Sequence, residues 1–223
     1  MKIFSDKQTH ARVSTTLPVI LLFLLIISTT ESIAASETRT NISLNYTPFH
    51  TGSAGYGVFI KNEERFRRGQ LVYAKQIYGI TVKMKRLFSF MPFYAHKHLH
   101  YSEAATKELS GLDINLGLKS SGLFLKNRVR GEYHITDDFY RIRNAIEAGY
   151  TPVPPVLSLF SRYEFRFDTD QERINLNDMS GGLIIKPAAQ LPIRLYYNRE
   201  MKRRNRNSWD NTDSICFSVS VVL

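Results

Sequence analysis

Residues 123–135 read LFLKNRVRGEYHI, and the alternation within this stretch decides the fold. One face carries Leu123, Leu125, Val129, Tyr133 and Ile135, and the other carries Lys126, Arg128, Arg130, Glu132 and His134. A period of two is typical of a β-strand whose two faces meet different surroundings. The run is also long, because strands of soluble proteins have a modal length of ~5–6 residues, whereas a tilted strand needs ~9–11 residues to cross a membrane.

The same alternation recurs along the chain, with turn residues between the runs. It predicts ten strands, at residues 55–62, 70–84, 87–101, 110–119, 122–135, 138–150, 155–168, 173–186, 190–201 and 213–223. No stretch after the N-terminal region has the pattern of a long helix. We therefore expect an all-β fold, namely an antiparallel transmembrane β-barrel of about ten strands, within a range of eight to twelve.

The first 34 residues have the three-part order of a secretory signal peptide. Lys2, Lys7 and Arg12 form a basic start, and residues 17–27 follow as an apolar run that is shorter than the ~20 residues of a membrane-spanning helix. Small residues then lead to Ala34, after which we expect cleavage. The sequence thus predicts a signal peptide over 1–34, a periplasmic N-terminal tail over 35–54 and a barrel over 55–223.

Composition excludes several other classes of protein. The chain has 223 residues, a formal net charge of +10 and a single cysteine, Cys216, so neither an intramolecular disulfide nor a cysteine-rich zinc site can form. A mean hydropathy of −0.24 is too polar for a bundle of membrane helices. The tail over 35–54 is rich in Ser, Thr and Gly and offers at most a short strand, at Ile42, Leu44 and Tyr46.

Alternation alone does not distinguish a membrane barrel from a soluble barrel that binds an apolar ligand. Besides strand length, two features favour the membrane. Tyr and Phe recur toward the strand ends, as interfacial aromatic girdles would require. The connections also alternate in length if the C-terminus is periplasmic: they are short at 85–86, 120–121, 151–154 and 187–189 and longer at 63–69, 102–109, 169–172 and 202–212. The connection at 136–137 is an exception, since it is short where this scheme requires a long one. An even number of strands would then place both chain ends in the periplasm.

The last segment, DSICFSVSVVL over 213–223, is similar to the C-terminal insertion signal of bacterial outer-membrane barrels. That signal has apolar residues at alternate positions, which are Ile215, Phe217, Val219, Val221 and Leu223 in this chain. Its usual final residue is Phe or Trp, so Leu223 departs from the pattern. The resemblance implies recognition by the barrel-assembly machinery and a location in the outer membrane.

Three interior segments of the sequence resemble those of an uncharacterised family of outer-membrane β-barrels, which is defined only as a domain of unknown function. They are LKNRVR at 125–130, FYRIRN at 139–144 and RYEFR at 162–166, and the resemblance covers about residues 55–223. The shared motif is an alternation of basic and aromatic residues. The family implies a fold and a location but no reaction, and it implies no cofactor.

In a membrane barrel the polar face of each strand points into the lumen. The predicted lumen charge ladder consists of Lys126, Arg128, Arg130, Glu132, Arg141, Arg143, Glu147, Arg162, Glu164, Arg166 and Arg194. A barrel of about ten strands is narrow, so these charges should pair and largely fill it. We expect a structural or narrow-passage role, and the excess of cations favours anions if the lumen conducts.

His96, His98 and His100 alternate on one strand, and we expect them to point into the lumen. Two of them, with Asp113 or Glu132, could bind Zn²⁺ or Cu²⁺. Loop 202–212 is basic and would meet the phosphates of lipopolysaccharide. Nucleic acid is not an expected partner of an exported chain, and we expect a monomer surrounded by outer-membrane lipid.

No catalytic signature is present. A Gly-x-Ser-x-Gly elbow is absent, and the spacing of His134 and Ser158 gives no support for a lipid-modifying pair. We therefore expect no enzymatic activity. A membrane-embedded lipid-modifying enzyme and a soluble exported barrel with an apolar ligand stay open as alternatives.

Overall fold

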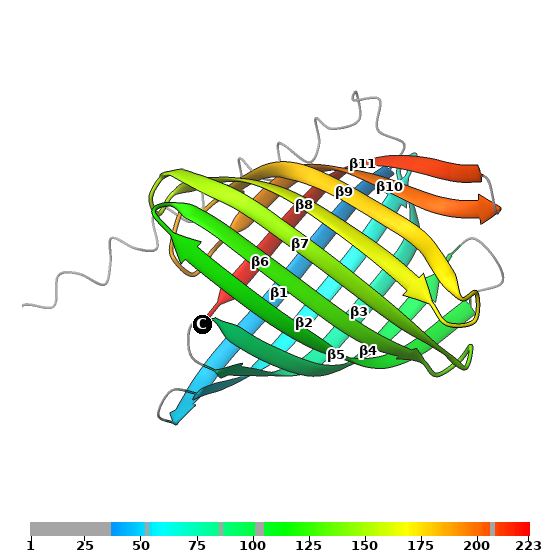
Figure 1. Cartoon of the computed structure of the whole chain (residues 1–223), viewed down its shortest axis with the longest axis horizontal. Coiled ribbons are helices and arrows are strands. Elements are labelled where there is room, and N and C mark those ends of the chain that lie inside the picture. Colours follow the sequence, from blue (N-terminus) through cyan, green and yellow to red (C-terminus); the bar gives the residue numbers. More distant parts are fainter. Residues whose placement is uncertain (1–36, 52–53, 85–86, 101–104, 206–207) are drawn as a thin grey trace, which may run out of the picture. The chain divides into compact units, whose positions relative to one another are not determined.

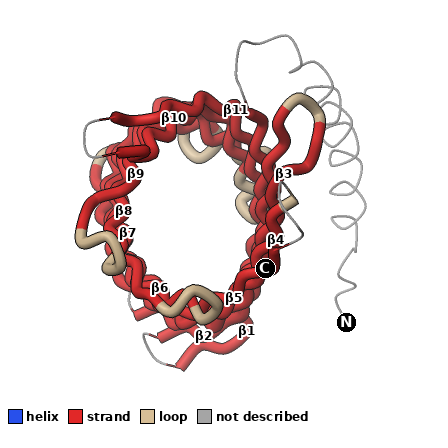
Figure 2. The backbone as a smooth tube through the Cα atoms, turned by 90° about the vertical axis from the view of Figure 1, so that its right-hand side faces the viewer, coloured by secondary structure: helices blue, strands red, loops and turns tan. Residues whose placement is uncertain are grey.

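The protein is a closed, all-β barrel of eleven strands (Figures 1 and 2). The computed structural model describes residues 37–51, 54–84, 87–100, 105–205 and 208–223. The predicted signal peptide, residues 1–34, lies outside these described residues. Among them no helix is long and apolar enough to cross a membrane. The barrel confirms the all-β class, and its strand number is one more than the ten counted from the sequence.

The strands follow one another around the barrel in chain order. Their bounds are β1 Glu37–Thr51, β2 Ala54–Arg67, β3 Gln70–Met84, β4 Phe88–Leu99, β5 Ala105–Ser120, β6 Leu123–His134, β7 Phe139–Val153, β8 Leu157–Asp168, β9 Arg173–Ile185, β10 Ile193–Asn205 and β11 Ser208–Val222. Every consecutive pair is antiparallel, and β1 closes the barrel by pairing in parallel with β11. Figure 2 shows the resulting ring from one end.

The eleventh strand is β1, which corrects the assignment of residues 35–54 to a tail. Its register runs from Glu37 opposite Ser214 to Asn45 opposite Val222, and its other edge pairs with β2. The segment was underestimated because its apolar residues are few. Its backbone N–H and C=O groups nevertheless supply both open edges of β2 and β11 with hydrogen-bond partners, which removes exposed sheet edges. The short strand expected within this segment is therefore a full-length strand.

The odd strand number places the two ends of the barrel chain at opposite rims. The C-terminal rim holds Leu223, the described connections at 121–122, 154–156 and 186–192, and the facing ends of β1 with β2 and of β3 with β4. The N-terminal rim holds Glu37, the described connections at 68–69, 135–138 and 169–172, and the facing ends of β4 with β5 and of β10 with β11. The expectation of both chain ends at one rim is therefore wrong.

The predicted alternation of short and long connections is also wrong, because the strands extend into the segments assigned to long loops. β2 continues to Arg67 and turns at Arg68–Gly69, which have φ of 51° and 75°. Ser121–Gly122 has φ of 47° and 82° at the C-terminal rim. Two consecutive residues with positive φ form the type I′ turn whose twist matches a two-residue β-hairpin. The described part of the basic segment 202–212 belongs to β10, which continues to Asn205, and to β11, which begins at Ser208.

The outer face of the barrel is apolar. Ile42, Ile80 and Leu123 are each 60% exposed. Water-soluble proteins rarely expose a continuous surface of such large aliphatic side chains. The outer face also carries exposed tyrosines, among them Tyr78, Tyr94, Tyr140, Tyr150 and Tyr197. Apolar residues therefore form a band on the outer face, and most of the charged residues of β6, β7 and β8 face inward.

The inner face is not uniformly polar. Ile77, Met91, Phe93, Ala95 and Leu109 form a buried cluster inside the barrel on β3, β4 and β5, with Phe59 of β2 packed against it. We call these six residues the inner apolar cluster. Gly111 of β5 leaves space for the inner apolar cluster. A Cβ atom at this position would overlap the Phe93 ring and the carbonyl oxygen of Gly131.

Candidate functional site: the barrel lumen

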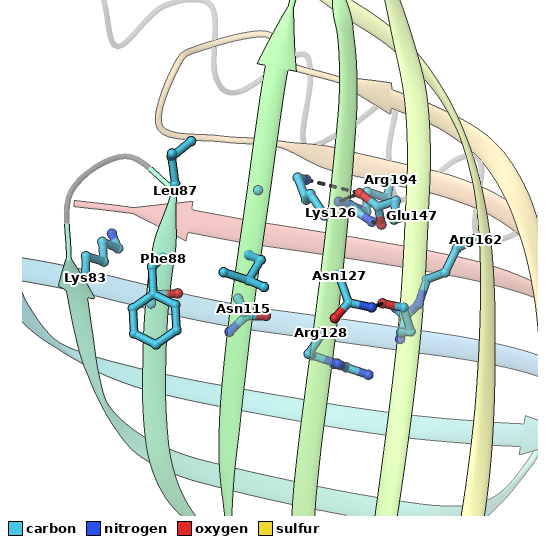
Figure 3. A pocket seen from close by; sticks show the side chains of 14 residues that line it. Lys83, Leu87, Phe88, Asn115, Lys126, Asn127, Arg128, Glu147, Arg162 and Arg194 are labelled. Atoms are coloured by element: carbon cyan, nitrogen blue, oxygen red, sulfur yellow. Dashed lines mark hydrogen bonds and ion pairs between the residues drawn. The ribbon is translucent and has the colours of Figure 1, made fainter.

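All eleven residues of the predicted charge ladder line the barrel interior, mainly on β6, β7 and β8. Two cavities occupy this interior, with volumes of about 660 Å³ toward the N-terminal rim and about 530 Å³ toward the C-terminal rim. The smaller cavity is shown in Figure 3, where Lys126, Glu147 and Arg194 lie together. Arg128 and Arg162 line both cavities, so these two side chains lie at the boundary between them.

Glu164 organises this boundary. Its side chain is almost fully buried, and it accepts hydrogen bonds from three arginines. Arg128 Nη2 lies 2.7 Å from Glu164 Oε2, Arg143 Nε lies 2.6 Å from Oε1, and Arg162 Nη2 also donates to Oε2. Arg143 also lies 3.5 Å from Glu132, so three guanidinium groups share two carboxylates here and positive charge is in excess.

A second buried carboxylate, that of Glu132 on β6, contacts cations on β3, β6 and β7. It lies 3.5 Å from Arg130, 3.5 Å from Arg143 and 3.8 Å from Lys75. Because Lys75 stands on β3, that contact spans the width of β4 and β5. The Glu132 carboxylate thereby joins two sides of the barrel.

Bidentate pairs anchor the rest of the network. Arg130 Nε and Nη2 lie 2.6 Å and 2.5 Å from the two oxygens of Asp113, while its guanidinium stacks 4.5 Å from the centre of the Phe93 ring. The charged side of the lumen therefore meets the inner apolar cluster at Arg130. Arg194 of β10 likewise binds Glu147 of β7 through two nitrogens, at 2.7 Å and 3.0 Å.

Positive charge predominates in the lumen. Of the described residues that line the larger cavity, thirteen are Lys or Arg and eight are Asp or Glu. The same sign prevails at the C-terminal rim, where Lys186 follows β9. Partial burial and the nearby cations Lys119, Lys126 and Arg194 lower the pKa of the Lys186 ammonium group.

Sequence reasoning missed the part of the lumen lined by β1, β2, β4 and β10. The missed residues include Arg39, Lys61, Glu63, Arg65, Lys97 and Glu200. Arg39 falls in the segment 35–54 predicted as a tail, and Glu63 and Arg65 fall in the predicted loop 63–69. Lys61, Lys97 and Glu200 lie within predicted strands, but the predicted lumen face does not include them. If the alternation is continued through residues 61–65, Lys61, Glu63 and Arg65 fall on one face of the strand.

The three predicted metal-ligating histidines do not share the lumen. The inward residues of β4 are Phe93, Ala95, Lys97 and Leu99, whereas His96 and His98 lie on the outer face with Tyr94. The predicted register is therefore wrong by one residue, and the proposed partners Asp113 and Glu132 stand on the other side of the wall. Among the described residues, no group of three or more His, Cys, Asp and Glu is arranged to hold a metal ion.

His134 and Ser158 are not brought together. His134 ends β6 near the N-terminal rim, where its ring stacks on Phe139. Ser158 lies at the start of β8 near the C-terminal rim and shares a hydrogen bond of 3.0 Å with Thr151. Cys216 lines the larger cavity and is 1% exposed.

On β11, the inward residues include Ser214 and Cys216, and the residues of the predicted insertion signal alternate with them. Ile215, Phe217, Val219 and Val221 thus lie on the outer face, and Leu223 follows at the rim, where its backbone N–H bonds the carbonyl oxygen of Asn45 at 2.9 Å. At the other end of the hairpin, Arg203 stacks 5.5 Å from the centre of the Trp209 ring.

No protein-family model matches the chain, and no curated protein matches it. Among solved structures, the chain is similar to one described as "KdgM porin in complex with disordered oligogalacturonate". The sequence identity is 11%, the match covers 79% of this chain and 92% of that chain, and the TM-score is 0.44. At this level of similarity, nothing about the function of this chain follows from that protein.

Proposed function

We propose that this protein is an outer-membrane β-barrel of the bacterial cell envelope with a narrow, anion-favouring passage and no enzymatic activity. The observation that carries the proposal is the boundary between the two cavities, where Arg128, Arg143 and Arg162 share the single carboxylate of Glu164. These arginines stand on the adjacent strands β6, β7 and β8, and a cluster of excess positive charge on the wall of a pore favours anions.

The membrane location is supported by the outer face. Ile42, Ile80 and Leu123 would be exposed to water in a soluble barrel, whereas they would meet lipid in a membrane. This disfavours the alternative of a soluble barrel with an apolar ligand. The separation of His134 from Ser158 gives no support to the alternative of a lipid-modifying enzyme.

The proposal extends to export and partners. A cleaved signal peptide over 1–34 would deliver the chain, and the barrel-assembly machinery would recognise β11 through its outward apolar row. The monomeric barrel would contact outer-membrane lipid along its apolar band. The Arg203–Trp209 tip of the β10–β11 hairpin would meet lipopolysaccharide phosphates if the N-terminal rim faces the outside.

Planar-bilayer recording with the purified protein tests the passage. We expect small conductance steps and, in a KCl gradient, a reversal potential of the sign that chloride selectivity gives. The double variant Arg128→Gln, Arg162→Gln removes two cations from the boundary and should shift that potential toward the cation side. Heat-modifiable mobility on gels shows whether the variant barrel is folded.

The matched control is Arg199→Gln. Arg199 pairs with Asp213 on the outer face, with Nε 3.1 Å from Oδ1, so its loss should leave the selectivity unchanged. Absence of conductance above the background of protein-free bilayers would refute the passage and leave a structural barrel. Cation selectivity of the wild-type protein would refute the role assigned to the arginines.

A further inference from the structure

We propose that His96 and His98 form a two-nitrogen binding site for Cu²⁺ or Ni²⁺ on the outer face of β4. The Nε2 atoms of the two rings lie 2.8 Å apart and share a hydrogen bond, so a bound cation would take the place of the shared proton, which is released to water. The site is separate from the lumen and from its charge network, so it does not depend on whether the barrel conducts.

The two imidazoles stand on the water side of the apolar band. Tyr94, two residues earlier on the same face, is 40% exposed and is one of the tyrosines of the outer face. On the adjacent strand β5, Glu108 lies opposite His96 and Thr106 lies opposite His98, and both of these residues are polar. A cation from solution could therefore reach the two rings without entering the lipid-facing region or the lumen.

The distance between the two Nε2 atoms limits the coordination geometries in which both can bind one metal ion. Metal–imidazole bonds are ~2.0–2.1 Å long. Two such bonds at a right angle hold their nitrogens ~2.9 Å apart, whereas a tetrahedral angle would separate them by ~3.4 Å. The observed 2.8 Å fits neighbouring positions of a square-planar or octahedral ion, and these geometries are preferred by Cu²⁺ and Ni²⁺ rather than by Zn²⁺.

The rings are also held in place. His96 and His98 meet edge to face, with centroids 4.4 Å apart and an angle of 78° between their planes. Thr106 Oγ1 lies 3.1 Å from Nδ1 of His98, the ring nitrogen that the metal would not use. A hydrogen bond at that nitrogen orients the ring, and with a metal on Nε2 the Nδ1–H group would donate to the threonine oxygen, as is common for metal-binding histidines.

The His96–His98 pair supplies two protein ligands. Because no group of three or more His, Cys, Asp and Glu residues in the described part of the chain can hold a metal, water would complete the coordination sphere. Such a site is open and exchangeable. It would take up borderline divalent cations that favour imidazole, rather than Ca²⁺ or Mg²⁺, which favour oxygen ligands.

Titration of the purified, full-length barrel, produced without a polyhistidine tag, with CuSO₄ and NiSO₄ tests this site. Calorimetry should show one equivalent bound, and the electron paramagnetic resonance spectrum of bound Cu²⁺ should show two coordinated nitrogens. His96→Gln and His98→Gln should each weaken binding at least ~10-fold, because each removes one of two protein ligands. His100→Gln is the matched control and should bind like the wild type.

Heat-modifiable gel mobility of each variant excludes unfolding as the cause of lost binding. Wild-type affinity in His98→Gln would overturn the proposal, as would a Cu²⁺ spectrum without two nitrogens. Loss of binding in His134→Gln instead would place the ion in the lumen and would equally overturn it. Tighter binding of Zn²⁺ than of Ni²⁺ would contradict the right-angle geometry.

Discussion

Arg65 Nη1 lies 3.2 Å from Glu200 Oε2, although Arg65 stands on β2 and Glu200 on β10. The ion pair therefore reaches across both strands of the parallel seam, β1 and β11. Arg39 of β1 donates to the same oxygen at 3.0 Å. The only parallel strand pair of the described barrel is thus secured by one carboxylate from inside.

Glu200→Gln should destabilise the barrel by about 1–3 kcal/mol, because it removes the carboxylate that the buried Arg39 and the half-buried Arg65 share. Each arginine is left with one longer contact, to Glu37 and Glu63 respectively. Urea titration of the folded protein, followed by heat-modifiable gel mobility, measures the change. Glu64→Gln is the control: Glu64 lies on the opposite face of β2 and accepts a hydrogen bond from Asn62. Equal stabilities of the two variants would show that the seam does not depend on Glu200.

Gly111→Ala should lower the stability by about 1–3 kcal/mol, since the added methyl group would overlap the Phe93 ring and a backbone oxygen. Gly131→Ala offers a matched comparison on the neighbouring strand, because a Cβ at Gly131 meets no atom within 4 Å. Thermal unfolding of both variants checks the difference. A tolerated Gly111→Ala would mean that the inner apolar cluster is loosely packed.

Ile80→Lys should disturb insertion into a bilayer, at a cost of about 2–4 kcal/mol if Ile80 lies near the membrane midplane. The side chain is 60% exposed on the outer face of β3. Asn211→Lys, on the outer face of β11 near the N-terminal rim, should insert normally. Insertion into lipid vesicles measures both, and normal insertion of Ile80→Lys would contradict a lipid-facing band.

Cys216, the single cysteine, offers a probe of the lumen field. Because its side chain is 1% exposed, Cys216 should react slowly in the folded barrel. Within this slow reaction, a negatively charged methanethiosulfonate reagent should be several-fold faster than a positively charged one of similar size, because cations predominate around the cavity. In denaturant this preference should disappear. A faster reaction with the cationic reagent in the folded barrel would contradict an anion-favouring lumen. Mass spectrometry after timed quenching follows both reactions.

The alternation of side chains was sufficient to predict the charged face of β6, β7 and β8. Leu123 to Ile135 could be assigned correctly because each charge alternates with an apolar or small residue, so the period is clear. β4 was assigned to the wrong face because residues 88–95 are apolar on both sides, and the inner apolar cluster, unlike a polar lumen, hides the period. A register error of one residue then reversed every side chain of the strand, His96 and His98 included.

Long-range pairing could not be predicted in the same way. Nothing local in residues 37–51 specifies a parallel partner 177 positions later, as for the Ser43–Ser220 hydrogen bond of 2.7 Å. Shared carboxylates such as Glu132 and Glu164 also depend on which strands face each other across the lumen. Their partners follow from closure of the barrel, and closure depends on the strand number.

The parallel seam has a consequence for engineering this chain. A barrel with an even number of strands can be circularly permuted with a short linker, because its first and last residues are neighbours. Here Glu37 and Leu223 lie at opposite rims, so a linker between them would have to run the full height of the wall or through the lumen. In a membrane, reporters fused to the two ends would consequently label opposite sides, and their accessibility would reveal the orientation of the barrel.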